Sequence, residues 1–356
     1  MMPKFLLYIS YKYGFPIVRP LQEEILKRGY EVAWFVEIEE NKSFLEPNER
    51  LLTTVNEVIT YRPDIVLVSS NVVPHFFSGI KVQLFHGFSV NKRSLNEGHF
   101  KIRGFFDLYC TQGPTSTSGF KAQQKKHSHF EVIETGWSKV DPLFPLKTKL
   151  KSATPTIMIA STFTKRLSLA VQDDVFNEIK RLSNTGKYKF IMVLHPKLPN
   201  AIKAKWKSLE NKNFTYYNTT DLIPLFKNSD IMFADTTSAI QEFLLQQKPV
   251  VTYNHTFNHN YLINITTPNA IENAFTQALH PSLNLTKNIE AFIEQLHPYF
   301  DGKSSERVID ACVTFLHKDK RYLKKKPLNL IRKYKIRKRL GYFTFKSYSK
   351  AYTLEN

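Results

Sequence analysis

The segment from Ser229 to Asn254 constrains the fold more than any other part of the chain. Residues 231–234 are a short apolar run typical of a buried parallel strand, and the polar residues DTTS at 235–238 follow it. A helix is expected next, ending at Lys248 and Pro249, before another strand at 249–253. Such a unit places a helix N-terminus at the carboxyl edge of a parallel sheet, where free amide groups favour a phosphate.

The rest of the chain repeats this alternation of strands and helices. We expect first-half strands at 5–10, 31–36, 64–69, 81–86, 107–111 and 131–135, with helical patterns at 21–28 and 51–61. A second series is expected at 156–160, 189–194, 215–217, 230–234 and 249–253, with a late helix at 306–316 that could cross back to the first domain. This pattern predicts two Rossmann-like, doubly wound α/β domains that face each other across a cleft.

The proline- and lysine-rich stretch after Gly136 is interpreted as the linker between the domains. The predicted boundaries are 1–145 for an N-terminal domain, 146–316 for a C-terminal nucleotide-binding domain and 317–356 for a basic, aromatic tail. The length of 356 residues and the apolar content of 42% suit two such cores.

Several features favour a cytoplasmic setting. The two cysteines show no metal-ligand or disulfide spacing. The apolar run at 5–9 is too short for a secretory signal, and no stretch approaches the ~20 apolar residues of a membrane-spanning helix.

The net charge of +19 is concentrated in the tail. Residues 317–356 contain 14 Lys and Arg against two carboxylates, so +12 of the formal charge lies there. Basic residues interleaved with Tyr, Phe, Leu and Ile suit an anionic membrane surface, which predicts a peripheral position on the inner face of the cytoplasmic membrane. RNA is a competing but less favoured partner, and a merely solvated tail is the simplest alternative.

Two histidines follow apolar strands at their carboxyl ends, where open α/β sheets bind ligands. His86 closes KVQLF and leads into Gly87, Lys92 and Arg93, while His195 closes KFIMVL and precedes Lys197. Gly87 permits close approach of a ligand, and the basic side chains can meet negative charge. A single histidine at a strand end is more often structural, but both domains repeat the arrangement.

A diphosphate site is expected in the second domain. Hydroxyls and cations follow the strand in IMIASTFTKRLS, and Glu242 sits one turn into the helix after Ser238, where it could accept hydrogen bonds from ribose or only favour the helix N-terminus. The candidate substrate-binding residues of this domain are Thr162, Lys165, Arg166, Lys197, Asp235, Thr236, Thr237, Ser238 and Glu242.

Several common chemistries find no motif. The sequence contains no GxGxxG, GxSxG, HExxH or Asp-x-Asp, so neither a metal nor another cofactor is expected.

Six segments together resemble the CDP-glycerol glycerophosphotransferase family, which includes teichoic acid primases and polymerases. They are HG at His86, GWSKVDPLF at Gly136, STFTKRLS at Ser161, LHPK at Leu194, SDIMFADTTSAIQEFLLQQKPVV at Ser229 and DGKSSERVID at Asp301. The resemblance covers roughly residues 5–315. Two departures stand out: the basic residue after HG is displaced, so that Lys92 or Arg93 would hold its role, and Ser161 replaces the usual proline.

The resemblance implies a GT-B fold, with a CDP-linked polyol donor in the C-terminal domain and a glycan or lipid-linked acceptor in the N-terminal one. It also implies that His86 is the catalytic base, that His195 serves the diphosphate, and that Thr237, Ser238 and Glu242 lie at the phosphates and ribose. In the expected reaction His86 deprotonates an acceptor hydroxyl, which attacks the phosphorus bearing the glycerol as CMP departs.

Two other functions remain open. The nucleotide end of the sheet also resembles UDP-N-acetylglucosamine 2-epimerases and GT-B glycosyltransferases, so a nucleotide-sugar enzyme is the first alternative. A nucleic-acid-binding protein with a degenerate enzyme fold is the second, and only the tail favours it.

Overall fold

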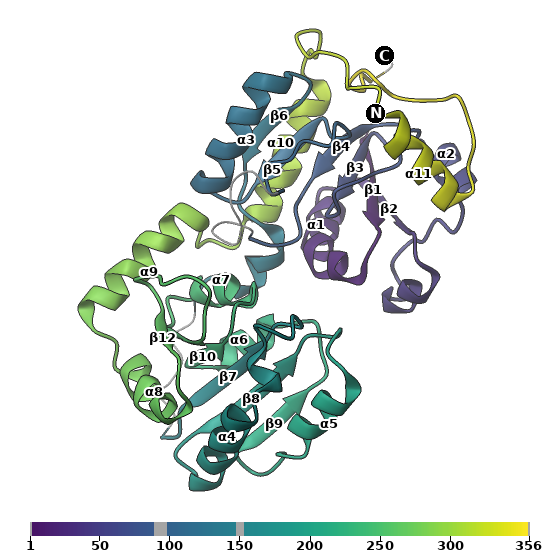
Figure 1. Ribbon diagram of the computed structural model, residues 1–356. Helices are drawn as coiled ribbons and strands as arrows, with labels where there is room; N and C mark the ends of the chain where they lie inside the picture. The colour runs from purple at the N-terminus through teal and green to yellow at the C-terminus, as the bar shows by residue number, and fades with distance from the viewer. Residues whose placement is uncertain (1, 89–97, 147–152, 355–356) are drawn as a thin grey trace. The chain divides into compact units, whose positions relative to one another are not determined.

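The computed structural model describes residues 2–88, 98–146 and 153–354, and the chain divides into two compact units (Figure 1). Unit 1 comprises Met1–Pro142 and Leu296–Asn356, and unit 2 comprises Leu143–Gln295. The first boundary lies three residues from the predicted one. The second differs, because the segment after Gln295, including the late helix and the tail, belongs to unit 1.

Unit 1 is a six-stranded parallel sheet with the order β2-β1-β3-β4-β5-β6. Its strands are β1 (Lys4–Ile9), β2 (Glu31–Val36), β3 (Ile65–Val68), β4 (Ile80–Gln83), β5 (Leu108–Thr111) and β6 (Glu131–Glu134). Its helices are α1 (Phe15–Lys27), α2 (Val55–Tyr61), α3 (Pro114–His127), α10 (Ser304–His317) and α11 (Leu330–Leu340). Most strand residues are fully buried, as expected for a parallel sheet covered on both faces.

Unit 2 is a second six-stranded parallel sheet, with the order β12-β11-β10-β7-β8-β9. Its strands are β7 (Thr156–Ser161), β8 (Lys189–Leu194), β9 (Phe214–Tyr217), β10 (Ile231–Ala234), β11 (Val250–Tyr253) and β12 (Ile263–Ile265). Its helices are α4 (Asp173–Thr185), α5 (Asn200–Lys207), α6 (Ile223–Asn228), α7 (Ala239–Leu244) and α8 (Ile271–Leu279), while α9 (Leu283–Leu296) ends at the boundary with unit 1.

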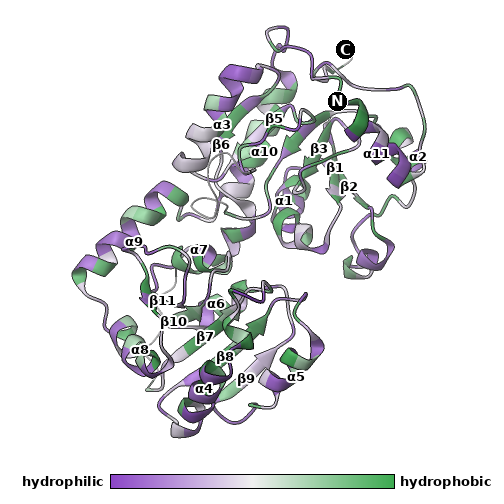
Figure 2. Cartoon of the chain, in the orientation of Figure 1, coloured by the Kyte–Doolittle hydropathy of each residue, from purple (hydrophilic) through white to green (hydrophobic). Residues whose placement is uncertain are grey.

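The hydrophobic character of both sheets explains why each sheet lies in the interior of its unit. Figure 2 shows the strands as predominantly hydrophobic and the helices as mixed, consistent with helices that bury one face on a sheet. Each unit has its own buried core: Ile159 and Phe233 lie in that of unit 2, and Tyr8 and Phe77 in that of unit 1. The prediction of two doubly wound α/β domains is therefore confirmed, whereas the cleft between them stays a prediction.

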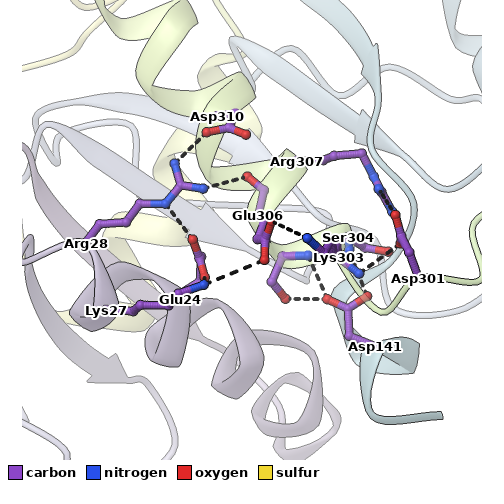
Figure 3. Close-up of polar contacts among 11 residues, drawn as sticks. Glu24, Lys27, Arg28, Asp141, Asp301, Lys303, Ser304, Glu306, Arg307 and Asp310 are labelled. Atoms are coloured by element: carbon purple, nitrogen blue, oxygen red, sulfur yellow. Dashed lines mark hydrogen bonds and ion pairs between the residues drawn. The ribbon is translucent and has the colours of Figure 1, made fainter. Parts of the chain in front are cut away.

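Helix α10 is fastened to unit 1 by a buried aspartate from the segment after β6 (Figure 3). The amides of Ser304 and Ser305 donate to the two carboxylate oxygens of Asp141 at 2.9 and 2.7 Å, and the Ser305 hydroxyl donates at 2.7 Å. Burial raises the pKa of Asp141. The segments GWSKVDPLF and DGKSSERVID thus meet, and Asp141 caps the N-terminus of α10.

Ion pairs where α1 meets α10 lie beside this cap. Arg28 bonds Glu24 on its own helix at 2.6 Å and Asp310 on α10 at 2.5 Å, and Arg307 pairs with Asp301 at 2.8 Å (Figure 3). Because Asp310 and Asp301 are largely exposed, these pairs contribute less than the buried cap.

The tail is an integral part of unit 1. Ile336 of α11 is buried in the core of this unit, and Lys326 forms a 2.7 Å ion pair with the buried Asp107 before β5. Within the described ranges, no helix has the length and apolar character needed to cross a membrane.

Candidate functional site

The carboxyl ends of β7, β8 and β10 form the candidate site of unit 2. Strand β7 lies between β10 and β8, and the chain reverses its direction of sheet growth between β7 and β10. Open α/β sheets bind ligands at such a switch point, beyond the carboxyl ends of the strands. The residues after these strands include most of those predicted from the sequence for this unit.

Asp235 occupies the centre of this edge, but its carboxylate faces the protein. It accepts hydrogen bonds from the Ser161 hydroxyl at 2.6 Å and from the amides of Thr162 and Leu169 at 2.9 Å each. Burial raises its pKa to about 6, against the opposing effect of these bonds. The carboxylate oxygens of Asp235 therefore hold the loop after β7, and its contact with substrate stays a prediction.

The loop from Thr162 to Ser168 carries the expected cations. Its two ends are joined by the Ser161–Ser168 hydroxyl pair at 2.8 Å. Lys165 and Arg166 are exposed between these anchored ends, and Thr162 is half-buried. The structure therefore presents two cations from a loop whose base is fixed by Asp235, an arrangement suited to an anionic ligand.

His195 lies beside this loop. Its ring is 4.5 Å from that of Phe163, and the Lys197 ammonium lies 5.2 Å from the Phe163 ring centre. The amide of Lys197 donates to His195 Nδ1 at 3.1 Å. Because Nδ1 accepts, the neutral imidazole carries its proton on Nε2 and can donate a hydrogen bond from that atom.

The hydroxyl groups of the DTTS turn make few contacts with the start of helix α7. Thr237 Oγ1 accepts from the Ala239 amide at 3.5 Å, a long capping contact, and Thr236 Oγ1 accepts from the Thr256 amide at 3.3 Å. Ser238 is the N-cap residue, with no capping bond from its side chain. The three hydroxyl-bearing residues are half-buried at the edge of the site.

Helix α7 is shorter than predicted. It ends at Leu244 rather than near Lys248, and Gln247 adopts a positive φ of 59° in the turn before β11. A helix of less than two turns makes a weaker dipole than the sequence implied. Glu242 is buried on this helix, so its contact with a ribose stays a prediction.

Sequence reasoning missed the contribution of β11. His255 follows VVTYN at the end of β11, its ring is 5.5 Å from that of His259, and the adjacent Thr256 amide reaches Thr236. A histidine just beyond an apolar strand was the signal used for His86 and His195. Applied to this strand, it would have found His255 as well.

Unit 1 presents His86 near its own switch point, between β1 and β3. The exposed His86 follows β4, and its Nδ1 lies 3.2 Å from the Ser69 carbonyl oxygen after β3. A carbonyl only accepts, so Nδ1 carries the proton and Nε2 of the neutral ring carries the lone pair. His86 is therefore set up to accept a proton, the reverse of His195.

Tyr13 is a second residue of this edge that sequence reasoning missed. Its ring centre is 5.1 Å from that of His86, and burial raises the pKa of its hydroxyl to about 12. The phenol is thus neutral at ordinary pH. Its position after β1 matches the strand-end rule, but an aromatic residue gave no signal of function.

Two carboxylates at the same edge are engaged by the protein. Glu37 follows β2 and bonds Tyr8 and Arg339, whereas Glu134 ends β6 and accepts from Thr117 Oγ1 at 2.5 Å and Tyr299 Oη at 3.0 Å. Compared with these residues, His86 is more accessible to a ligand.

The other predictions for unit 1 concern the segment after His86. A Cβ added to Gly87 would meet no described protein atom within 4 Å, so packing does not demand glycine there. Lys92 and Arg93 lie outside the described residues. Across the parts of the chain that the structure describes, no cluster of three or more His, Cys, Asp and Glu side chains could hold a metal.

Solved structures share this fold at low sequence identity. They include S. aureus MnaA with UDP (TM-score 0.60, 15% identity, covering 92% of this chain and 99% of that one). A variant of the wall teichoic acid polymerase TagF soaked with CDPG has a TM-score of 0.64 and 13% identity, and the match covers 88% of this chain and 88% of that one. The UDP-GlcNAc 2-epimerase from Neisseria meningitidis bound to UDP-GlcNAc has a TM-score of 0.60 and 13% identity, and the match covers 88% of this chain and 100% of that one. These likenesses establish the GT-B fold.

Sequence comparison identifies the family. No curated protein sequence matches the chain. Residues 115–313, more than half of the chain, match the family model for UDP-N-acetylglucosamine 2-epimerase. This agrees with the resemblance seen at the nucleotide end of the sheet and not with a match to the glycerophosphotransferase family as such. The chain belongs to the UDP-N-acetylglucosamine 2-epimerase family.

Proposed function

We propose that this protein transfers glycerol phosphate, or a related polyol phosphate, from a CDP-linked donor to a hydroxyl of a glycan or lipid-linked acceptor in the synthesis of a cell-surface polymer. The observation that carries the proposal is the opposite hydrogen bonding of the two strand-end histidines. His86 holds a lone pair on Nε2, and His195 holds a proton there. One is suited to take a proton from an attacking hydroxyl, and the other to donate to a phosphate oxygen.

The donor is assigned to unit 2. The diphosphate would contact the exposed cations Lys165, Arg166 and Lys197 together with His195 and the hydroxyls of Thr162, Thr237 and Ser238. Phosphoryl transfer depends on positioning and charge neutralisation, and this edge supplies hydroxyl, imidazole and cationic donors. Asp235 would act indirectly, by holding the loop from which two of these cations project.

In the proposed reaction His86 Nε2 accepts the proton of the acceptor hydroxyl. The acceptor oxygen forms a bond to the phosphorus that carries the glycerol, and the bond between that phosphorus and the bridging oxygen of CMP breaks. CMP leaves with the electron pair. General base catalysis of this kind contributes roughly 10² to 10⁴ in rate.

A nucleotide-sugar enzyme is the second candidate, and the family match favours it. In that case unit 2 would bind a UDP-sugar in place of a CDP-linked donor. Epimerisation moves a proton on and off carbon and needs groups placed for both steps. In unit 1 the edge carboxylates Glu37 and Glu134 are already bonded within the protein, which favours hydroxyl activation by His86.

Ligand-dependent stabilisation separates the two candidates. The melting temperature of the full chain would be measured with CMP, CDP, CDP-glycerol, UDP, UDP-GlcNAc and GDP, since a ligand at 100 times its Kd stabilises by about 2.7 kcal/mol. The stabilising donor would then be incubated with candidate acceptors and the products separated by chromatography. Stabilisation by cytidine nucleotides with CMP release supports the proposal. Stabilisation by UDP alone, with UDP release or an epimerised sugar, overturns it.

A further inference from the structure

Helix α11 packs one face on unit 1 and leaves several large apolar side chains of its other face exposed. Lys333 and Ile336 face unit 1 and are 9% and 3% exposed. Lys333 Nζ donates to Ser347 Oγ at 3.1 Å, and Ile336 packs into the core. The inward face is therefore partly basic, and the helix is held in this orientation by its own contacts.

The outward face carries a cluster that we call the tail patch: Leu330, Ile331, Tyr334 and Phe343. Their exposed fractions are 69%, 73%, 57% and 66%. On a helix the first three lie within a sector of about 100°, and the rings of Tyr334 and Phe343 are 6.5 Å apart, so the four side chains adjoin. Contiguous apolar side chains on a surface mark an interaction site, whereas isolated ones do not.

Cations border the tail patch. Arg332, Lys335, Lys338 and Arg339 are exposed on the same helix. Among them, Arg339 pairs with Glu37, while Lys335 and Lys338 have no ion pair among those formed by the described residues. The patch therefore combines large apolar and aromatic side chains with positive charge.

We propose that the tail patch docks on an anionic lipid surface, with α11 lying parallel to the membrane. Apolar and aromatic side chains flanked by Lys and Arg are the composition of interfacial helices, and anionic headgroups attract the bordering cations. A second copy of this chain would bring its own cations against them, which disfavours self-association. RNA would use the cations but leave Leu330 and Ile331 without a role. The inference stands independently of which donor unit 2 binds.

The experiment uses the full chain, because truncation before α11 would remove Ile336 from the core. Flotation with vesicles of phosphatidylglycerol and phosphatidylcholine, or of phosphatidylcholine alone, measures the partition coefficient. The double variant Ile331→Ser and Phe343→Ser should bind anionic vesicles at least about tenfold more weakly. A matched control, Leu26→Ser and Leu283→Ser, removes two exposed leucines elsewhere and should bind as the parent protein does.

Charge is tested separately. Lys335→Gln with Lys338→Gln should weaken anionic binding several-fold, and Lys207→Gln with Lys212→Gln, with the same net charge, should weaken it less. Equal binding to neutral and anionic vesicles, or no loss in the Ile331 and Phe343 variant, overturns the proposal. So does a concentration-dependent dimer in light scattering that this variant abolishes, or salt-sensitive RNA binding without vesicle binding. Circular dichroism and the melting temperature check that each variant is folded.

Discussion

In unit 1 the Nδ1–H of the strand-end histidine donates a hydrogen bond to a carbonyl, whereas in unit 2 Nδ1 of the strand-end histidine accepts a hydrogen bond from an amide. Both follow apolar strands of parallel sheets, and the sequence makes them look alike. The neighbouring backbone group, Ser69 in one case and Lys197 in the other, decides which ring nitrogen is protonated. Equivalent positions in two similar sheets thus acquire opposite chemical capacities from one backbone contact.

The two units also differ in how each uses a buried aspartate. Asp141 caps α10 and so completes the fold of unit 1, whereas Asp235 holds the loop that carries the cations of unit 2. Burial raises the pKa of both carboxyl groups. Substitutions in the two units should therefore have separable effects, on stability in one case and on donor binding in the other.

The largest expected effect tests the base. His86→Ala should lower kcat by roughly 10² to 10⁴, with the donor Kd little changed, because the proton acceptor is lost and unit 2 is intact. Steady-state kinetics with the donor identified by stabilisation would measure it. His127→Ala, which removes another exposed histidine of unit 1, is the control and should retain activity. Full turnover of His86→Ala with saturating substrates would remove His86 from the mechanism.

The next effect is the pH dependence that Asp235 gives to the free energy of unfolding. Its pKa of about 6 in the folded protein exceeds the value of about 3.9 in an unfolded chain, so the folded state binds the proton more tightly. The free energy of unfolding should therefore fall by about 3 kcal/mol as pH rises from about 4 to 6, and then level off.

Asp235→Asn removes this titration. Urea unfolding of both proteins at several pH values should show the parent losing stability relative to the variant between pH 4 and 6. A constant difference would mean that the aspartate does not titrate in this range. Weaker nucleotide binding by the variant would support the role of Asp235 in holding the loop.

Loss of the cap on α10 should have a smaller effect. Asp141→Ala leaves the Ser304 and Ser305 amides without their partner and should lower the free energy of unfolding by about 2 kcal/mol. Asp310→Ala, which removes an exposed partner of Arg28, should cost less than about 1 kcal/mol. Denaturant titrations would give both values. If Asp141→Ala instead weakened nucleotide binding at unchanged stability, the contrast between the two aspartates would fail.

The smallest effect tests the donor hydrogen of His195. His195→Asn should raise the donor KM about tenfold, the value of one hydrogen bond to a charged group, with a lesser change in kcat. His195→Gln places an amide donor near the position of Nε2 and should recover most of the affinity. Similar losses in both variants would indicate a packing role against Phe163.

The strands were predictable because parallel strands buried on both faces are continuous apolar runs. Among the strands of the described residues, β12 alone was missed, since its three half-buried residues make no such run. The predicted length of α7 was wrong because the turn at Gln247 depends on a positive φ, which cannot be predicted from a glutamine in the sequence.

The site was less predictable than the fold. Strand ends located His86, His195 and the STFTKRLS loop, but the direction of the Asp235 carboxylate depends on donors about 70 residues away in sequence. Likewise, a lysine-rich tail gives no sign that Lys326 would be buried against Asp107. The motifs at Gly136 and Asp301 resembled functional segments, yet their contacts here close unit 1.

The division of the chain also bears on its synthesis. Unit 2 is continuous, whereas unit 1 needs residues on both sides of it. On the ribosome the six strands of unit 1 emerge before unit 2, whereas α10, whose Cys312 lies buried against Cys110 of β5, emerges after it. Unit 2 can reach its folded state during that interval. The nascent chain thus has a period in which its first sheet is synthesised but the surface that α10 covers is exposed, and chaperones that bind apolar segments can act during that period.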